Sequence, residues 1–167
     1  MDRTSKFAYA ELREKSGKAE AAEFLKNLIK AVPYHIKTIL TDNGAQFSSR
    51  SKNSFAPQHI FDRICEENGI EHRLTKVNHP WTNGQIERMN RTLKEATVKR
   101  YHYGNHQQLQ AHLSSFLDVF NLTKRLKALQ GMTPYEYVLK CWKESPKLFR
   151  SDPTHLSQGP NNQFLPG

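Results

Sequence analysis

The sequence predicts an α/β domain, because short strand-like runs alternate along the chain with longer segments of helical periodicity. At 167 residues and 19.4 kDa the chain has the size of one domain and can bury a core. Its hydrophobic content of 37%, with 10% aromatic residues, is that of a rather polar globular protein. We expect one domain over residues 1–143 and a flexible tail over residues 144–167.

The first 42 residues contain two predicted strands with one predicted helix between them. Residues 1–6 are turn-like, and residues 7–12 alternate in polarity as a strand does. Residues 18–31 repeat apolar side chains at helical spacing, and Pro33 ends that helix. Residues 35–41 form a β-branched run that places Asp42 at the carboxyl end of a strand. Binding sites of α/β sheets gather at such ends.

The chain from residue 60 onward is predicted to be mainly helical. A short helix over residues 60–68 ends at Asn68 and Gly69, and a strand follows over residues 70–77. Two further helices are expected over residues 85–101 and 106–122. A last helix runs to about residue 143 and begins with a capping box, in which Thr133 is the N-cap, Pro134 is at N1 and Glu136 is at N3. Residues 48–58 and 78–84 are predicted loops.

Charge and composition narrow the class of partner. The net charge of +9 and the pI near 9.6 indicate a polyanionic partner, although a merely solvated basic face is the alternative. Residues 73–127 carry ten Lys or Arg against three acidic residues. Because this excess surrounds Glu87, we favour nucleic acid as the partner. Cys65 and Cys141 are expected to be buried free thiols, since they form no metal-binding or disulfide pattern.

No membrane segment or targeting signal is recognisable, so we expect a cytoplasmic protein with access to DNA. The eight histidines are scattered singly, without the spacing of metal ligands. No arrangement of a nucleophile with a histidine base stands out, and no glycine-rich phosphate loop is present.

Asp42 and Glu87 are the candidate catalytic and metal-binding residues. A carboxylate at a strand end and a carboxylate on a helix can each offer hard oxygen ligands to Mg²⁺ for phosphoryl transfer. Each residue also has an ordinary interpretation. The sequence Asp-Asn-Gly is a strong turn signal, and a glutamate in the first turn of a helix stabilises the helix dipole.

The helix around Glu87 strengthens the functional interpretation. Ile86, Met89 and Leu93 form one apolar stripe, continued by Ala96 or Thr97. Glu87, Arg91 and Lys94 recur at i, i+4 and i+7 on a separate, exposed face. A carboxylate with two adjacent cations could bind metal and hold DNA phosphates. An intrahelical ion pair is the alternative.

Four segments resemble the retroviral-type integrase core, and especially the DDE transposases of bacterial insertion sequences. They are TDNGAQF at residues 41–47, NGIEH at residues 68–72, HPWTNGQIERMNRTLK at residues 79–94 and GMTPYE at residues 131–136. The resemblance covers residues 2–143 and implies a ribonuclease H-like fold. Such enzymes use three carboxylates to hold two Mg²⁺ ions, which activate a water or a DNA 3′-hydroxyl for attack on a phosphodiester.

The resemblance assigns Asp42 as the second carboxylate and Glu87 as the third. It also implies a DNA-binding face on which Arg91 and Lys94 match basic positions of the family. The expected members of this face are Arg88, Arg91, Lys94, Lys99 and Arg100. The expected partners are DNA, as transposon ends and target, and either a second copy of the chain or a full-length transposase.

The chain departs from the family at its start. The family's first Asp lies on an opening strand, whereas the chain is similar to the family only from the turn that follows the second strand. We therefore expect an integrase core that lacks its first two strands, with impaired catalysis and a tendency to self-associate at the open sheet edge. Asp2 is assigned to the turn and not to the metal site.

The sequence leaves three alternative interpretations of the chain open. The chain could be a non-catalytic DNA-binding fragment that interferes with full-length transposase. It could be a decaying gene fragment without function. It could also be a ribonuclease H-like nuclease, against which the basic Glu87 helix argues.

Overall fold

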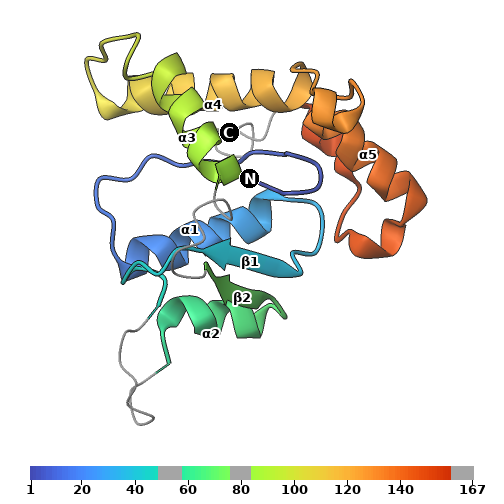
Figure 1. The fold of residues 1–167 in the computed structure, drawn as a ribbon, viewed down its shortest axis with the longest axis horizontal. Coiled ribbons are helices and arrows are strands. Elements are labelled where there is room, and N and C mark those ends of the chain that lie inside the picture. The colour runs from blue at the N-terminus through green and yellow to red at the C-terminus, as the bar shows by residue number, and fades with distance from the viewer. Residues whose placement is uncertain (49–57, 76–83, 159–167) are drawn as a thin grey trace, which may run out of the picture. The chain divides into compact units, whose positions relative to one another are not determined.

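The computed structural model describes residues 1–48, 58–75 and 84–158. The predicted loops over residues 48–58 and 78–84 and the end of the predicted tail lie almost entirely outside the described residues. The chain divides into two compact units, one formed by Met1–Leu12 with Gly84–Gly167 and the other by Arg13–Asn83. Figure 1 labels the helices and strands of the two units.

The unit of Arg13–Asn83 contains two helices and two strands, in the order α1 (Lys18–Ala31), β1 (Thr38–Thr41), α2 (Ile60–Glu67) and β2 (Glu71–Leu74). Helix α1 has the predicted bounds. The strands are shorter than predicted but lie where the β-branched and apolar runs indicated. Helix α2 ends as predicted: Asn68 caps it, and Gly69 follows with a φ of 64°, which glycine adopts without strain.

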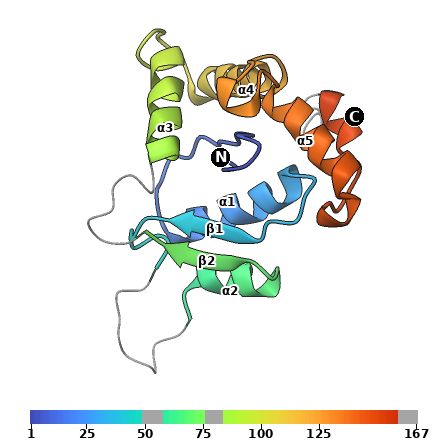
Figure 2. The same cartoon turned by 45° about the vertical axis from the view of Figure 1, so that its right-hand side comes forward.

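Strands β1 and β2 form a parallel pair, which Figure 2 shows side by side and pointing the same way. The register pairs Thr38 with Glu71 and Ile39 with His72. A parallel pair requires a crossover connection, and α2 lies in this crossover. The core of the unit joins the two helices, and its buried members are Ala21, Ala22, Leu25, Phe61, Ile64, Cys65 and Ile70. This packing holds the end of β1, where Asp42 follows.

The second unit begins with a turn and an extended segment. Both carboxylate oxygens of Asp2 accept hydrogen bonds from the turn, including the backbone N–H groups of Thr4 and Ser5. The assignment of Asp2 to a turn is therefore confirmed. The predicted strand over residues 7–12 is wrong, because this segment is extended but pairs with no strand among the residues that the structure describes. The side chain of Asn121 instead bonds to the Ala8 backbone.

Helices α3 (Gly84–Ala96) and α4 (His106–Leu122) follow in this unit. The predicted helix over residues 85–101 is wrong at its end, which comes five residues earlier, at Ala96. The buried Thr97 turns its hydroxyl onto the carbonyl oxygen of Leu93 at 2.6 Å, and the next residues form a turn. Helix α4 has the predicted bounds, with Asn105 as its N-cap.

The remaining elements are α5 (Pro134–Glu144) and the short 3₁₀ helices η2 (Lys127–Leu129), η3 (Pro146–Leu148) and η4 (Pro153–Gln158). The capping box at the start of α5 is present as predicted. The hydroxyl of Tyr135 donates to the carbonyl oxygen of Pro153 at 3.0 Å, which holds η4 on α5. The contact therefore ties α5 to Pro153 of the expected tail, of which residues 159–167 are not described.

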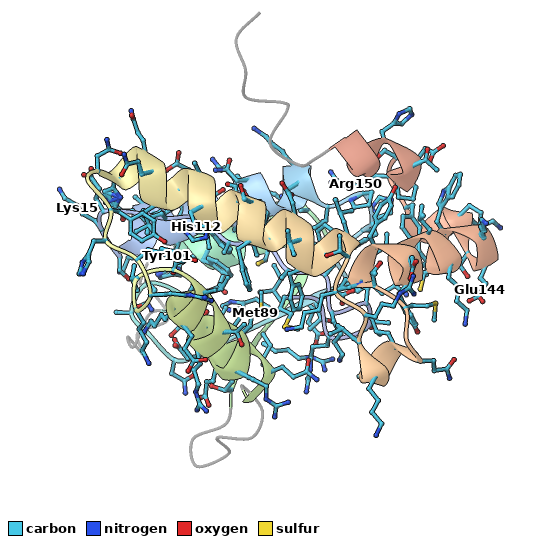
Figure 3. All side chains as sticks on the ribbon, turned by 90° about the horizontal axis from the view of Figure 1, so that it is seen from above. Lys15, Met89, Tyr101, His112, Glu144 and Arg150 are labelled. Carbon is cyan, nitrogen blue, oxygen red and sulfur yellow. The ribbon has the colours of Figure 1, made fainter. Side chains whose placement is uncertain are left out.

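The core of the second unit lies between α3, α4 and the extended first residues. Its buried members are Ala8, Met89, Leu113, Leu117 and Phe120, and Figure 3 labels Met89 on α3. Cys65 is buried and free as predicted, whereas the free Cys141 is only half-buried. Among the described helices, none combines the length and the apolar character needed to cross a bilayer.

Candidate active site

Asp42 directly follows β1 and is exposed, as the strand prediction required. One carboxylate oxygen, Oδ1, accepts a hydrogen bond from the backbone N–H of Gly44 at 2.8 Å. This is the turn geometry that Asp-Asn-Gly predicts. In the described part of the chain, no hydrogen bond or ion pair occupies Oδ2. The turn therefore orients the carboxylate and leaves one oxygen for a ligand.

The backbone around Asp42 is tied to the end of β2. The N–H of Thr75 donates to the carbonyl oxygen of Thr41 at 2.8 Å. The side-chain amide of Asn43 donates to the carbonyl oxygen of Thr75 at 3.1 Å. These two bonds hold the residues on both sides of Asp42 against the neighbouring strand.

A chain of polar side chains, centred on the buried ring of His72, lies on the face of the strand pair that α2 covers. His72 is the register partner of Ile39, and its Nε2 lies 2.8 Å from the hydroxyl of Thr41, two residues further along β1. The other ring nitrogen, Nδ1, lies 2.5 Å from a carboxylate oxygen of Asp62 on α2. The His72 side chain is only 6% exposed and packs against the ring of Phe61. Asp62, His72 and Thr41 thus form a hydrogen-bonded chain that ends beside Asp42.

Two other groups near the strand pair have shifted pKa values. The hydrogen bond from Arg73, which also forms an ion pair at 2.7 Å, lowers the pKa of Glu71, and a hydrogen bond from Thr38 adds to the effect. Burial, with the charge of Asp62 nearby, raises the pKa of Cys65 to about 11. Cys65 is therefore a core thiol and not a nucleophile.

Glu87 lies in the first turn of α3 and is exposed. In the described residues, no ion pair or hydrogen bond joins it to Arg91, so the intrahelical pair expected as the alternative is not formed. Met89 and Thr97 of the predicted apolar stripe are buried, whereas Ile86 is 38% exposed. The helix therefore has a buried side and leaves Glu87 on the solvent side.

The five expected DNA-binding residues are all exposed: Arg88, Arg91, Lys94, Lys99 and Arg100. The first three lie on α3, and the last two lie in the turn after it. Within the described ranges none of them forms an ion pair with a carboxylate. Five cations without carboxylate partners remain available to an anionic ligand.

An aromatic cluster anchors the turn that carries Lys99 and Arg100. Figure 3 shows Tyr101 beside His112 of α4, and their ring centroids lie 5.0 Å apart. The hydroxyl of Tyr103 lies 2.5 Å from Nδ1 of His112. The guanidinium of Arg100 lies over the Tyr101 ring, 5.7 Å from its centroid. The cluster thus holds the basic turn against α4.

The donor chemistry at Asp42 and Glu87 suits a divalent cation, because both are exposed carboxylates with free oxygens. The two residues belong to different units, and each carboxylate is described within its own unit. Among the residues that the structure describes, no three side chains of His, Cys, Asp or Glu gather as a metal-binding group.

Solved structures define the class of fold. The chain is similar to the catalytic core domain of BIV integrase, with a TM-score of 0.62 and 23% identity over 86% of this chain and 83% of that one. It is also similar to a chain of the simian T-cell lymphotropic virus intasome solved with PP2A regulatory subunit B56 gamma, with a TM-score of 0.61 and 23% identity over 77% and 42% of the two chains. The fold is the ribonuclease H-like fold of retroviral integrase catalytic cores.

Sequence comparison identifies the family. Two family profiles, both described as integrase core domain, match residues 1–80 and residues 68–134. The chain belongs to the integrase core family, whose members act in DNA integration and transposition.

Two sequence relatives support this assignment. They are the uncharacterized protein K02A2.6 of Caenorhabditis elegans, 31% identical over 137 residues, and the retrovirus-related Pol polyprotein from transposon TNT 1-94 of Nicotiana tabacum, 37% identical over 60 residues. These matches cover 81% and 36% of this chain. The chain spans only 10% and 4% of the lengths of these two relatives.

Sequence reasoning missed the chain of Asp62, His72 and Thr41. The histidines were considered by their spacing in sequence, and His72 is far from both of its partners along the chain. No local signal could have found this chain, because it depends on the register of β1 against β2.

Proposed function

We propose that the chain provides a DNA-binding surface and two metal-binding carboxylates, Asp42 and Glu87, for DNA integration or transposition. The observation that carries the proposal is the exposed face of α3. It presents Glu87 together with Arg91 and Lys94, and none of the three has an ion-pair partner among the described residues.

In this function the basic side chains bind DNA before the two carboxylates take part. Arg88, Arg91 and Lys94 bind DNA phosphates and fix the position of the strand without reading its sequence. Lys99 and Arg100 extend the contact beyond the helix. When bound, Mg²⁺ would supply Lewis-acid stabilisation of the reacting phosphodiester. Asp42 and Glu87 would each offer carboxylate oxygens to a divalent cation from their own unit, and the Gly44 hydrogen bond fixes the orientation of the Asp42 carboxylate.

We further propose that the chain alone turns over DNA poorly. The family chemistry requires three carboxylates, and the described residues contain no cluster of three metal-binding side chains. DNA as transposon end or target, and either a second copy or a full-length transposase, are the partners we propose. The solved intasome relative supports an assembly of this kind.

The test measures Mn²⁺ binding by electron paramagnetic resonance, and cleavage and strand transfer of a labelled DNA duplex. Asp42→Asn and Glu87→Gln are compared with Glu95→Gln, which removes another exposed carboxylate from α3. We expect weaker Mn²⁺ binding in the first two variants only, with turnover near background in all proteins.

Turnover that Glu87→Gln abolishes would confirm the site and overturn the proposed impairment. Mn²⁺ binding and turnover that are equal in all four proteins would overturn the site. Tight DNA binding without any Mn²⁺ binding would favour the alternative function, a non-catalytic DNA-binding chain that interferes with full-length transposase. That alternative predicts lower transposition when the chain is co-expressed with the intact enzyme.

A further inference from the structure

His72 is a polar link between α2 and the end of β1. Its ring is nearly inaccessible, with 6% of the side chain exposed, yet both of its nitrogens have polar partners. Those partners come from two different elements, Asp62 from the helix and Thr41 from the strand. A buried histidine with two such partners has a fixed ring orientation.

The hydrogen-bonding roles follow from the chemistry of the three groups. An ionised carboxylate only accepts, so Nδ1 of His72 carries the proton that points to Asp62. In the neutral ring, Nε2 is then an acceptor, and the single proton of the Thr41 hydroxyl is donated either to it, at 2.8 Å, or to the neighbouring carbonyl oxygen of Asp42. The Thr41 hydroxyl also lies 3.0 Å from the carbonyl oxygen of Asp42. His72 therefore acts on the residue that directly precedes Asp42.

We propose that His72 is a positioning residue for Asp42, which it orients through the hydroxyl of Thr41. The inference rests on the proposed function of Asp42 as a metal ligand. Thr41 is held from two sides, by His72 through its hydroxyl and by Thr75 through its carbonyl oxygen. Because Thr41, the last residue of β1, is held in this way, the backbone leaves the strand in a defined direction. The carboxylate of Asp42 reaches Gly44 from that direction, and among the described residues none bonds to its Oδ2.

Asp62, His72 and Thr41 are the residue types of a nucleophilic triad, in which Thr41 would be the nucleophile. The geometry does not support this role. The Thr41 hydroxyl points into hydrogen bonds with His72 and the Asp42 carbonyl oxygen, and the register places it on the face of the strand pair that α2 covers. Thr41 is therefore a link in the chain to Asp42 and not a reacting group.

The test uses two pairs of variants of the full chain. Thr41→Val removes the hydroxyl at constant shape, and Thr41→Ser keeps it. His72→Asn keeps a polar atom near the position of Nδ1 and loses the contact to Thr41, whereas His72→Gln keeps a polar atom near the position of Nε2. Each pair thus separates the loss of the link from the loss of bulk.

The first readout is amide hydrogen exchange of Gly44 without metal, because this N–H reports the bond to Asp42 Oδ1. Exchange of the Leu25 amide, in the core of the same unit, corrects for changes in overall stability. We expect Gly44 to exchange roughly fivefold to tenfold faster in Thr41→Val and His72→Asn, as expected for loss of one hydrogen bond. Thr41→Ser and His72→Gln should stay within about twofold of the wild type.

The second readout is the Mg²⁺-induced shift of the Gly44 amide resonance. We expect a weaker Mg²⁺ response in Thr41→Val and His72→Asn. Equal Gly44 exchange in the Val and Ser variants, or in the Asn and Gln variants, would overturn the positioning role. If the wild type shows no Mg²⁺ response while the exchange differences are present, the proposed metal site of Asp42 fails and the link through Thr41 stands.

Discussion

The side-chain amide of Asn121 takes the place of a neighbouring strand for Ala8. Its oxygen accepts from the Ala8 N–H, and its nitrogen donates to the Ala8 carbonyl oxygen, both at 2.8 Å. Asn121 is 2% exposed and Ala8 is 4% exposed, so water cannot replace either bond. One residue of α4 thus satisfies both backbone groups of an extended segment that lies 113 positions earlier in the chain.

Replacing Asn121 should therefore destabilise the protein strongly. We expect Asn121→Leu to lower the free energy of unfolding by roughly 2–4 kcal/mol, because two buried backbone groups lose their partners. Urea denaturation measures the change. Val119→Ala, on the exposed side of the same helix, should change stability by no more than about 0.5 kcal/mol. Equal effects of the two substitutions would contradict the role of Asn121.

The hydroxyl of Thr133 should stabilise the start of α5. It accepts from the backbone N–H of Glu136 at 3.1 Å, and the Glu136 carboxylate accepts from the N–H of Thr133 at 2.9 Å. We expect Thr133→Ala to cost about 1–2 kcal/mol, the usual value for an N-cap. Thr133→Ser retains the hydroxyl and should cost much less. A thermal melt of both variants tests this, and a stable Ala variant would refute it.

Asp118 should make stability depend on pH. Its buried Oδ1 has no hydrogen-bond partner within the described ranges, and burial raises the pKa of the carboxyl above the ordinary value of 3.8. The folded state therefore holds the proton more tightly than the unfolded state, and stability falls as pH rises through 3.8 toward the folded pKa.

The variant Asp118→Asn should consequently be more stable than the wild type at pH 7. We expect a gain below roughly 1 kcal/mol, since partial exposure lets water screen the charge. The gain should disappear below about pH 3.8, where the carboxyl is protonated in both states. Urea midpoints across this pH range measure it, and a gain that does not change with pH would argue against the mechanism.

Cys65 should report opening of the unit that carries Asp42. With a pKa of about 11, about one Cys65 thiol in a thousand is ionised at pH 8, and the residue is only 2% exposed. We expect iodoacetamide at pH 8 to modify the half-buried Cys141 first, and Cys65 only in denaturant. Mass spectrometry of tryptic peptides distinguishes the two thiols. Rapid labelling of Cys65 in the folded protein would contradict its burial.

The basic face of α3 should produce salt-dependent DNA binding. We expect Arg91→Gln together with Lys94→Gln to reduce the slope of log affinity against log salt by about 1.8, for two lost phosphate contacts. Lys26→Gln, which removes an exposed charge from α1, should leave the slope unchanged. Fluorescence anisotropy at several salt concentrations measures the slopes. If all variants share one slope, DNA binds elsewhere.

Local signals predicted the helices well. Helix α1 has the predicted bounds because its apolar period is regular and a proline follows it closely. The capping box was readable because Thr133, Pro134 and Glu136 are close in sequence and act on one another. These features depend on contacts within a few residues.

Features that depend on distant partners were not predictable. The alternation over residues 7–12 is typical of a strand, but the partner of Ala8 is a side chain on α4. Helix α3 stops at Ala96, where the Thr97 hydroxyl bonds back to Leu93 and Thr97 itself is buried in the unit. The link from Asp62 to Thr41 requires the register of two strands, which the sequence of either strand does not contain. The roles of Asp42 and Glu87 remain predictions.

Glu136 serves more than the start of α5. Its carboxylate also pairs with both terminal nitrogens of Arg125, at 3.2 and 3.3 Å, and Arg125 in turn donates to the carbonyl oxygen of Gly131 at 2.9 Å. A single inherited change at position 136 would therefore disturb the helix start, the arginine and the turn before it together. Among descendants of this gene, positions 125 and 136 should consequently change in concert, and a lone substitution at either should be rare.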